Sequence, residues 1–300
     1  MFAFIARRLG SGALLLLVIS SLAYFLMFFS PSNIAINLLG DAATPEQLVA
    51  KEIELGLDRP ILDRYLEWLG SAVTGDLGTS WFSSEPIVQA LLSRLPVTLT
   101  LVSVTILLTA LVATILGTAA AVRGGVIDRI VQVLGVAGFA IPNFVIAIFL
   151  VTVFAIQLYL LPATGWVPLE QDPSLWLQSL ILPVSALVLG SVASSSAQIR
   201  SAVKAVLEKD WVRTLRARGL SEREILLKHV LRAAAPAGLT ILSLQFVGML
   251  GGTVIIERLF SYEGLGNMAI DAVINRDLPL IQGIVILFAA IFTAVNLVVD

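Results

Sequence analysis

The chain has 300 residues, of which 58% are hydrophobic and only 13% are charged, and its formal net charge is −2. Soluble domains carry about 25% charged residues, so this composition predicts a protein whose main solvent is lipid rather than water. The sequence has no cysteine and a single histidine, His229, which excludes disulfides, a cysteine nucleophile and metal sites built on thiolates or on several histidines.

Six runs along the chain are apolar enough to cross a bilayer, which takes about 20 residues of helix. None has a Lys, Arg, Asp or Glu in its interior, and one such charge at mid-membrane would cost about 2.5–3.5 kcal/mol. We therefore predict six transmembrane helices. They cover residues 9–29, 97–122, 130–161, 179–199, 233–256 and 278–299.

The first and third runs need separate interpretation. Arg7 and Arg8 precede the first run as in a signal peptide, but a signal peptide has an apolar core of only about 7–15 residues. The first run is longer and no small-residue cleavage pattern follows it, so we predict an uncleaved span. The third run is too long for one crossing and contains Pro142, which removes a helical hydrogen bond. A kink, or a short helix ending before Pro142, would absorb the excess.

The distribution of charge predicts the orientation. With the N-terminus inside, the inner segments hold 13 of the 19 cations, and the outer segments hold 6 cations against 15 acids. Because cytoplasmic loops carry an excess of Lys and Arg, we predict a cytoplasmic N-terminus. The inner segments are residues 1–8, 123–129 and 200–232, and the outer segments are residues 31–96, 162–178 and 257–277.

The long outer segment contains signals for two short helices. Thr44 is a suitable N-cap for a helix over 45–55 with proline in its first position. A second helix, starting after 58–60, has an apolar stripe and is expected to close at Gly70. Two interpretations stay open: a small cap packed on the outer membrane face, or a docking surface for a soluble partner outside.

The inner segment 200–232 has nine cations and four acids. Asp210 is a candidate N-cap for the helix that follows it, and Gly219 suits the C′ position because glycine adopts positive φ without penalty. Residues 221–224 form a capping-box pattern that opens a second helix, expected to stop before Pro236. The segment therefore reads as helix, glycine turn, helix. Contact with anionic lipid, a structureless retention signal and a docking element for a soluble partner are the three alternatives.

Several segments together resemble a known family. They include Gly-Asp-Leu-Gly at 75–78, Trp-Val-Arg-Thr-Leu-Arg-Ala-Arg-Gly-Leu-Ser at 211–221 and Tyr-Glu-Gly-Leu-Gly at 262–266, with further matches at 6–9, 55–60, 65–69, 95–98, 257–261 and 276–279. In this order along essentially the whole chain, they resemble the permease subunits of binding-protein-dependent ABC importers. The resemblance is strongest to the first permease of the di-/oligopeptide group, which also has nickel and glutathione relatives.

The inner segment is similar to the EAA region of that family, whose general form is Glu-Ala-Ala followed four residues later by Gly. Gly219 is retained, but Arg213, Thr214 and Leu215 stand at the Glu-Ala-Ala positions, so no particular ionic contact carries over. The resemblance implies that this segment couples to a cytosolic ATPase. The implied coupling residues are Trp211, Arg213, Thr214, Leu215, Arg216, Ala217, Arg218, Gly219, Leu220 and Ser221.

The resemblance further implies an all-α polytopic membrane protein with the type I ABC importer permease fold, in a bacterial plasma membrane. Its expected parts are residues 1–30 with the first span, an extracytoplasmic loop region 31–96 and a permease core 97–300. The implied partners are a second homologous permease, two cytosolic ATPases or a fused pair, and an extracytoplasmic binding protein, with no nucleic acid. ATP and Mg²⁺ would be bound by the ATPases and no cofactor by this chain, which has no phosphate-binding P-loop pattern.

Polar residues inside the spans are candidates for lining a pathway. They are Asn143, Gln198 and Gln245, and further candidates are Gln157 and the serines at 194–196. Hydrogen bonding between helices is the alternative role. His229 is expected at an interface rather than in catalysis. A stand-alone ion-coupled carrier would need ionisable groups near mid-membrane, and a membrane enzyme would need a catalytic cluster; the spans offer neither. Peptides are the expected cargo, with nickel, glutathione or another small solute as alternatives.

Overall fold

The computed structural model describes residues 2–28, 34–40 and 42–299. These residues form helices joined by irregular connections, with a single antiparallel bridge between Thr79 and Pro86 in the described part. The chain divides into two compact units. Unit 1 combines Met1–Pro96 with Glu263–Val298, and unit 2 is Val97–Tyr262. The predicted division into 1–30, 31–96 and 97–300 concerns the position of each part relative to the membrane rather than packing, and it stays a prediction.

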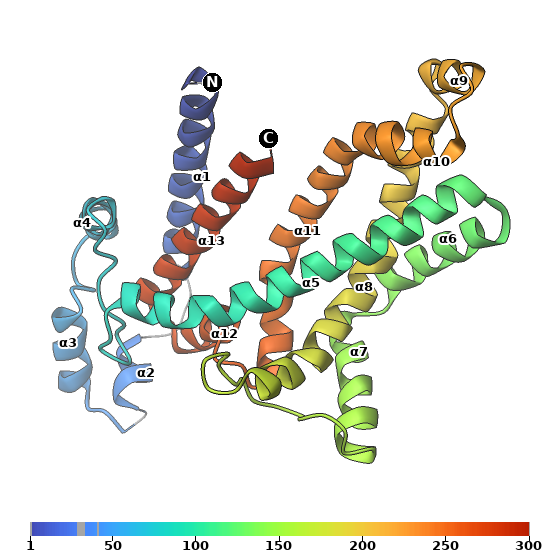
Figure 1. Cartoon of the computed structure of the whole chain (residues 1–300). Helices are drawn as coiled ribbons and strands as arrows, with labels where there is room; N and C mark the ends of the chain where they lie inside the picture. Colours follow the sequence, from blue (N-terminus) through green and yellow to red (C-terminus); the bar gives the residue numbers. More distant parts are fainter. Residues whose placement is uncertain (1, 29–33, 41, 300) are drawn as a thin grey trace. The chain divides into compact units, whose positions relative to one another are not determined.

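Unit 1 contains α1 (Phe2–Phe28), α2 (Ile34–Leu39), α3 (Pro45–Glu54), α4 (Ile61–Val73), α12 (Leu265–Asn275) and α13 (Leu278–Val299). Unit 2 contains α6 (Gly125–Ala140), α7 (Asn143–Leu150), the π-helix η1 (Val151–Gln157), α8 (Pro173–Leu207), α9 (Asp210–Ala217), α10 (Glu222–Glu224), the π-helix η2 (Ile225–Val230) and α11 (Leu231–Leu259). The boundary between the units falls inside α5 (Ile87–Arg123), which runs on through Pro96 (Figure 1).

Five helical stretches of the described chain are long and apolar enough to cross a membrane: Gly10–Met27, Ile87–Arg123, Pro173–Leu207, Glu222–Leu259 and Leu278–Val299. They correspond to five of the six predicted spans. The remaining predicted span, 130–161, is divided at Pro142 into α6 and the shorter apolar stretch Asn143–Gln157. The expected break is therefore confirmed, and it takes the form of a separate helix before Pro142.

The outer segment confirms most of its predicted caps. Thr44 and Gln47 form a reciprocal capping box at the start of α3, with proline in the first turn. The prediction that Gly70 ends the second helix is wrong, because α4 continues to Val73. The helix ends where Gly75, with φ +90°, donates its N–H to Ala72 O and Asp76 donates to Ser71 O. These paired bonds satisfy the last carbonyls, so an earlier stop is not needed.

In unit 1 the two ends of the chain pack together. Gln282 of α13 is fully buried and donates Nε2–H to the carbonyl of Ser20 in α1, at 3.1 Å. A Cβ added at Gly12 would meet the Thr293 side chain, so the two helices are also in close contact nearer their other ends. A second cluster joins Ile87, Leu91 and Leu265 to the α13 face. The first and last spans thus form one packed pair.

Replacing Asp277 by alanine should destabilise unit 1 by about 2 kcal/mol. The Asp277 carboxylate, 1% exposed, accepts hydrogen bonds from Ser80 Oγ and from the Trp81 and Leu280 amides. It therefore caps α13 and fixes the turn before α5. Thermal unfolding of the purified protein in detergent measures the loss. Asp63→Ala, at an exposed position of α4, is the control, and equal melting temperatures for the two variants would contradict this role.

In unit 2, α6 and α7 pack on α8 through small residues. A Cβ at Gly138 would lie 2.3 Å from that of Ala193, and one at Gly190 would lie 2.1 Å from Asn143 Oδ1. The start of α8 is held by Tyr262, whose hydroxyl donates to Ser179 O at 2.7 Å. Burial raises the pKa of Tyr262 to about 12, so it remains a donor at neutral pH. These contacts place α8 at the centre of unit 2.

Candidate functional site

The short helix α9 follows α8 after a two-residue connection and lies at one end of unit 2 (Figure 1). The prediction that Asp210 caps it is wrong, because Lys209 occupies the N-cap with an extended backbone and Asp210 is the first helical residue. The Asp210 carboxylate accepts instead from Arg213, one turn on, at 3.3 Å. An acid in the first turn still stabilises the helix through its dipole. Asp210 therefore marked the start of the helix correctly, although the N-cap is the residue before it.

The end of α9 is set by Gly219, as predicted. Gly219 has φ +82° and donates to Arg216 O at 2.9 Å, while Leu220 donates to Leu215 O at 3.3 Å. This pair of bonds is a Schellman motif. Its usual apolar contact is present too, since Leu215 and Leu220 pack against the same buried cluster. The chain therefore turns sharply and in one defined geometry.

Ser221 begins the next helix and accepts from the Glu224 amide at 3.2 Å, so the predicted N-cap is confirmed. The Glu224 carboxylate pairs with Lys228 at 2.7 Å. The prediction that this helix stops before Pro236 is wrong. A continuous helical stretch runs from Glu222 to Leu259, and Thr240 Oγ donates to the Pro236 carbonyl. The second inner helix is thus the first part of a span, and Pro236 lies inside that span without interrupting the helix.

An exposed ion pair between Arg216 and Glu222 joins the two sides of the turn. Arg216 Nε and Nη2 donate to the two Glu222 carboxylate oxygens at 2.7 and 3.2 Å, a bidentate pairing. The hydrogen bond to Glu222 raises the pKa of the Arg216 guanidinium. Side chains on both sides of the turn are therefore connected to each other as well as through the backbone.

One face of α9 is buried and the other is exposed. Val212 of α9 is fully buried in a cluster with Ile225 and Val230 of η2 and with Ile199 and Val203 of α8, so α9 packs against the end of unit 2. The exposed residues are Trp211, Arg213, Thr214, Arg216, Ala217, Arg218, Gly219 and Ser221, while Leu215 and Leu220 are half-buried. Beside them is a shallow hollow of about 600 Å³, lined by Trp211, Lys228, His229, Arg232 and Ala233. The outward surface is predominantly cationic.

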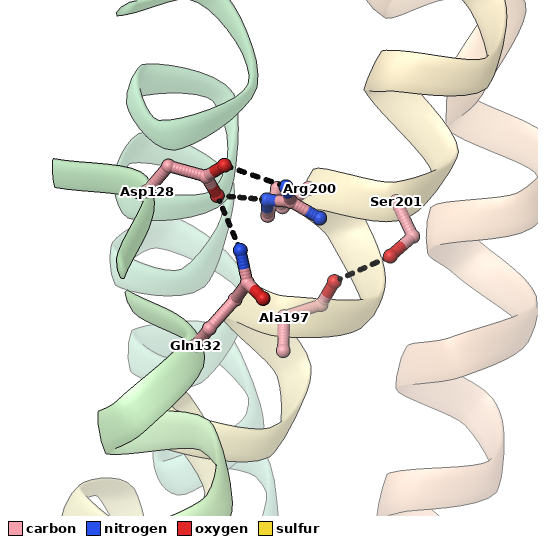
Figure 2. A network of polar contacts seen from close by, with 5 residues as sticks. All are labelled: Asp128, Gln132, Ala197, Arg200 and Ser201. Atoms are coloured by element: carbon pink, nitrogen blue, oxygen red, sulfur yellow. Dashed lines mark hydrogen bonds and ion pairs between the residues drawn. The ribbon is translucent and has the colours of Figure 1, made fainter. Parts of the chain in front are cut away.

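An ion pair ties α8 to α6 just before this surface (Figure 2). Arg200 Nη2 donates to Asp128 Oδ2 at 2.7 Å, Arg200 Nε donates to Oδ1, and Gln132 Nε2 donates to Oδ1 at 3.1 Å. The bond to Arg200 holds the pKa of the Asp128 carboxyl below its ordinary value of 3.8. The pair is therefore intact at neutral pH and is lost only on strong acidification. The sequence offered no signal for this pairing, since the partners are 72 residues apart.

Breaking this pair should weaken the folded state of unit 2. We expect Asp128→Arg and Arg200→Asp each to lower thermal stability, because each places like charges in a site where both side chains are less than one-fifth exposed. The exchanged double variant should recover most of the lost stability. Melting of the purified protein in detergent is the measurement. A double variant no better than the singles would show that the two side chains do not act as a pair.

The candidate pathway residues lie on three different helices. Asn143 is half-buried at the start of α7 with its amide oxygen against Gly190 of α8. Gln198 is exposed on α8 and Gln245 is half-buried on α11. No hydrogen bond among the described residues joins any two of them. Asn143 has the surroundings of a contact between helices, and the lining role of all three remains a prediction.

A helical chain with several lipid-crossing helices and a rigid cationic helix between two of them has the architecture of a transport permease. The chain belongs to the family described as "Binding-protein-dependent transport system inner membrane component". The family profile matches residues 113–300, and the companion profile for the N-terminal part of these membrane components matches residues 1–102.

Similar proteins cover the full length of the chain. A putative peptide transport system permease protein of Brucella abortus is 36% identical over 100% of this chain and 96% of its own. A dipeptide transport system permease protein of Lactococcus lactis is 32% identical, and a glutathione transport system permease protein of Salmonella choleraesuis is 35% identical, both with the same coverage. These relatives make the chain a multi-pass membrane component of an ABC transport system.

The fold agrees with a solved structure. A crystal structure of an amino acid ABC transporter with histidines aligns with 71% of this chain and 92% of its own, with a TM-score of 0.54 and 17% identity. At this identity the likeness supports the helical permease fold and nothing more specific.

Proposed function

We propose that this chain is the membrane-spanning subunit of an ATP-driven importer that moves di- or oligopeptides, delivered by an extracytoplasmic binding protein, into the cytoplasm. The full-length relatives named for peptide and dipeptide transport favour this cargo over glutathione. The chain itself is the non-catalytic partner: it pairs with a second permease, and two cytosolic ATPases bind ATP and Mg²⁺.

The observation that carries the proposal is the construction of α9. Its cationic face is exposed, its apolar face is buried, and both of its flanking turns are fixed by hydrogen bonds. A surface held this firmly transmits a push into the span that follows it, whereas a flexible loop would absorb the push. Residues 211–221 are therefore the proposed docking element, and ATPase closure would move them toward and away from the membrane.

The orientation follows from the same proposal. If α9 meets a cytosolic ATPase, the N-terminus is cytoplasmic and the segment 31–96 is on the outer side, in agreement with the charge distribution. Surface labelling of intact cells tests this directly: residues 200–232 should be protected. Labelling of that segment from outside would overturn both the orientation and the docking role.

The function is tested by reconstitution. The chain, its paired permease and the ATPases are placed in vesicles with binding protein outside and ATP inside, and radiolabelled dipeptide uptake is measured. Uptake should require both ATP and binding protein. Uptake that survives ATP depletion with a proton or sodium gradient intact would favour an ion-coupled carrier. Uptake of glutathione but not of dipeptides or oligopeptides would keep the architecture and reject the peptide cargo.

A further inference from the structure

The helix α4 has one apolar face that packs against the protein and a second, adjacent apolar stripe that is exposed. Ile61, Tyr65 and Trp68 pack toward α1 in a cluster with Tyr24. Leu62, Leu66 and Val73 lie next to that face. Because they are four and seven residues apart, they fall on one side of the helix. These three side chains are 59%, 60% and 82% exposed. Asp63, Arg64 and Glu67 occupy the remaining side, and Glu67 forms a bidentate pair with Arg59.

The contacts of α4 place it beside the first span rather than beyond its end. The Tyr65 hydroxyl is 2.7 Å from Ser21 Oγ and 3.3 Å from Ser20 Oγ, and the Tyr65 and Tyr24 ring centroids are 5.1 Å apart. The apolar window of α1 ends at Met27, so these serines lie about 10 Å inside it at 1.5 Å per residue. Figure 1 shows α4 alongside α1.

The span beside the exposed stripe has exposed apolar side chains of its own. On α1, Leu14, Leu22 and Leu26 are 57–70% exposed, as expected for a span with few neighbours in its own chain. Because α4 is fixed beside that span, its exposed Leu62, Leu66 and Val73 side chains should contact lipid as well. The cluster Tyr24, Tyr65, Trp68 and Trp81 is of the type enriched at the membrane–water boundary. Amphipathic helices of this kind bury their apolar face about 5–10 Å into that boundary.

We propose that α4 is an interfacial helix whose Leu62, Leu66 and Val73 side chains insert into the acyl chains of the leaflet next to segment 31–96. The occupant of the stripe is lipid, not a second protein. The Arg59–Glu67 pair and Asp63 then lie at the headgroup level, and α4 anchors the outer segment at a fixed depth beside α1. This role does not depend on the identity of the transported solute.

The absence of cysteine from the sequence makes a direct test possible. Leu66→Cys and Val73→Cys are labelled with a nitroxide in the complete transporter, with partners lacking reactive cysteine, in phosphatidylcholine–phosphatidylglycerol vesicles. Asp63→Cys is the matched control on the polar side of the same helix, and Leu62→Cys replaces either stripe variant that fails to assemble. Collision of the nitroxide with oxygen, which partitions into lipid, is compared with collision with a water-soluble nickel chelate.

Oxygen collisions should exceed nickel collisions at 66 and 73, and the ratio should reverse at 63. Nickel accessibility at all three positions would mean that the stripe faces water and would overturn the proposal. Protection of 66 and 73 from both reagents would mean that protein covers the stripe and would overturn it equally. Neither result would bear on ATP-driven uptake, so the outcome is independent of the proposed function.

Discussion

Reversing the charge of Arg213 and Arg218 together should strongly lower ATP-driven uptake while leaving the chain folded in the membrane. Both side chains lie on the exposed side of α9 and its C-terminal turn, and neither contributes to the buried cluster beneath it. Two glutamates would reverse the charge that the proposed docking surface offers to an ATPase, and each 1.4 kcal/mol of lost binding lowers the population of the complex about tenfold. We therefore expect at least about tenfold less uptake, with the ATPases lost on co-purification.

Two further variants separate docking from general damage. Lys51→Glu reverses one charge in the segment 31–96 and should leave uptake and co-purification unchanged. Gly219→Val keeps every charge but forces a branched residue into φ +82°, a genuine outlier for such a side chain, so it should disrupt the turn and also lower uptake. Normal ATPase binding by both the double reversal and Gly219→Val would refute the docking role of residues 211–221.

Replacing Gly117 by leucine should prevent unit 2 from folding normally. Even a Cβ at this position would lie 2.7 Å from Ser196 O and 3.0 Å from Arg200 N, both backbone atoms of α8. Neither atom can move without moving the helix, so α5 and α8 must separate. Overpacking costs about 1–3 kcal/mol when side chains can adjust, and here we expect about 3 kcal/mol or more, measured as a lower melting temperature and a smaller folded yield.

Gly248→Leu is the matched control for this prediction. Gly248 is also inside a long helix of unit 2, but a Cβ there would meet nothing within 4 Å. Glycine is a poor helix former relative to leucine, so this variant should melt at the same temperature as the natural protein or slightly higher. Equal effects of the two substitutions would show that the contact at Gly117 is not close enough to matter.

Local signals in the sequence predicted several of the helix ends. Thr44, Gly219 and Ser221 act through hydrogen bonds to residues three or four positions away, so their roles can be predicted from a few neighbouring residues. The errors at Gly70, Asp210 and Pro236 have a common cause. Each residue type permits a helix to start or stop without requiring it, and at α4 the hydrogen bonds of Gly75 and Asp76 terminate the helix later than Gly70.

Contacts between distant segments could not be predicted from the sequence. The apolar runs predicted spans because bilayer thickness imposes a length on them. Nothing comparable links Asp128 to Arg200, Asp277 to Ser80 or Tyr65 to Ser21, which depend on how the helices pack. The proposed docking residues were located by their resemblance to a family, whereas their division into buried and exposed side chains required the structure.

The contact at Gly117 has a mechanical consequence. Between α5 and α8 there is no layer of side chains at this point to compress or slide, and on another side of α8 the Asp128–Arg200 pair holds α6. If an ATPase displaces α9 as proposed above, the movement should therefore reach α5, α6 and α8 together, because close contacts already join these three helices near the end of α8.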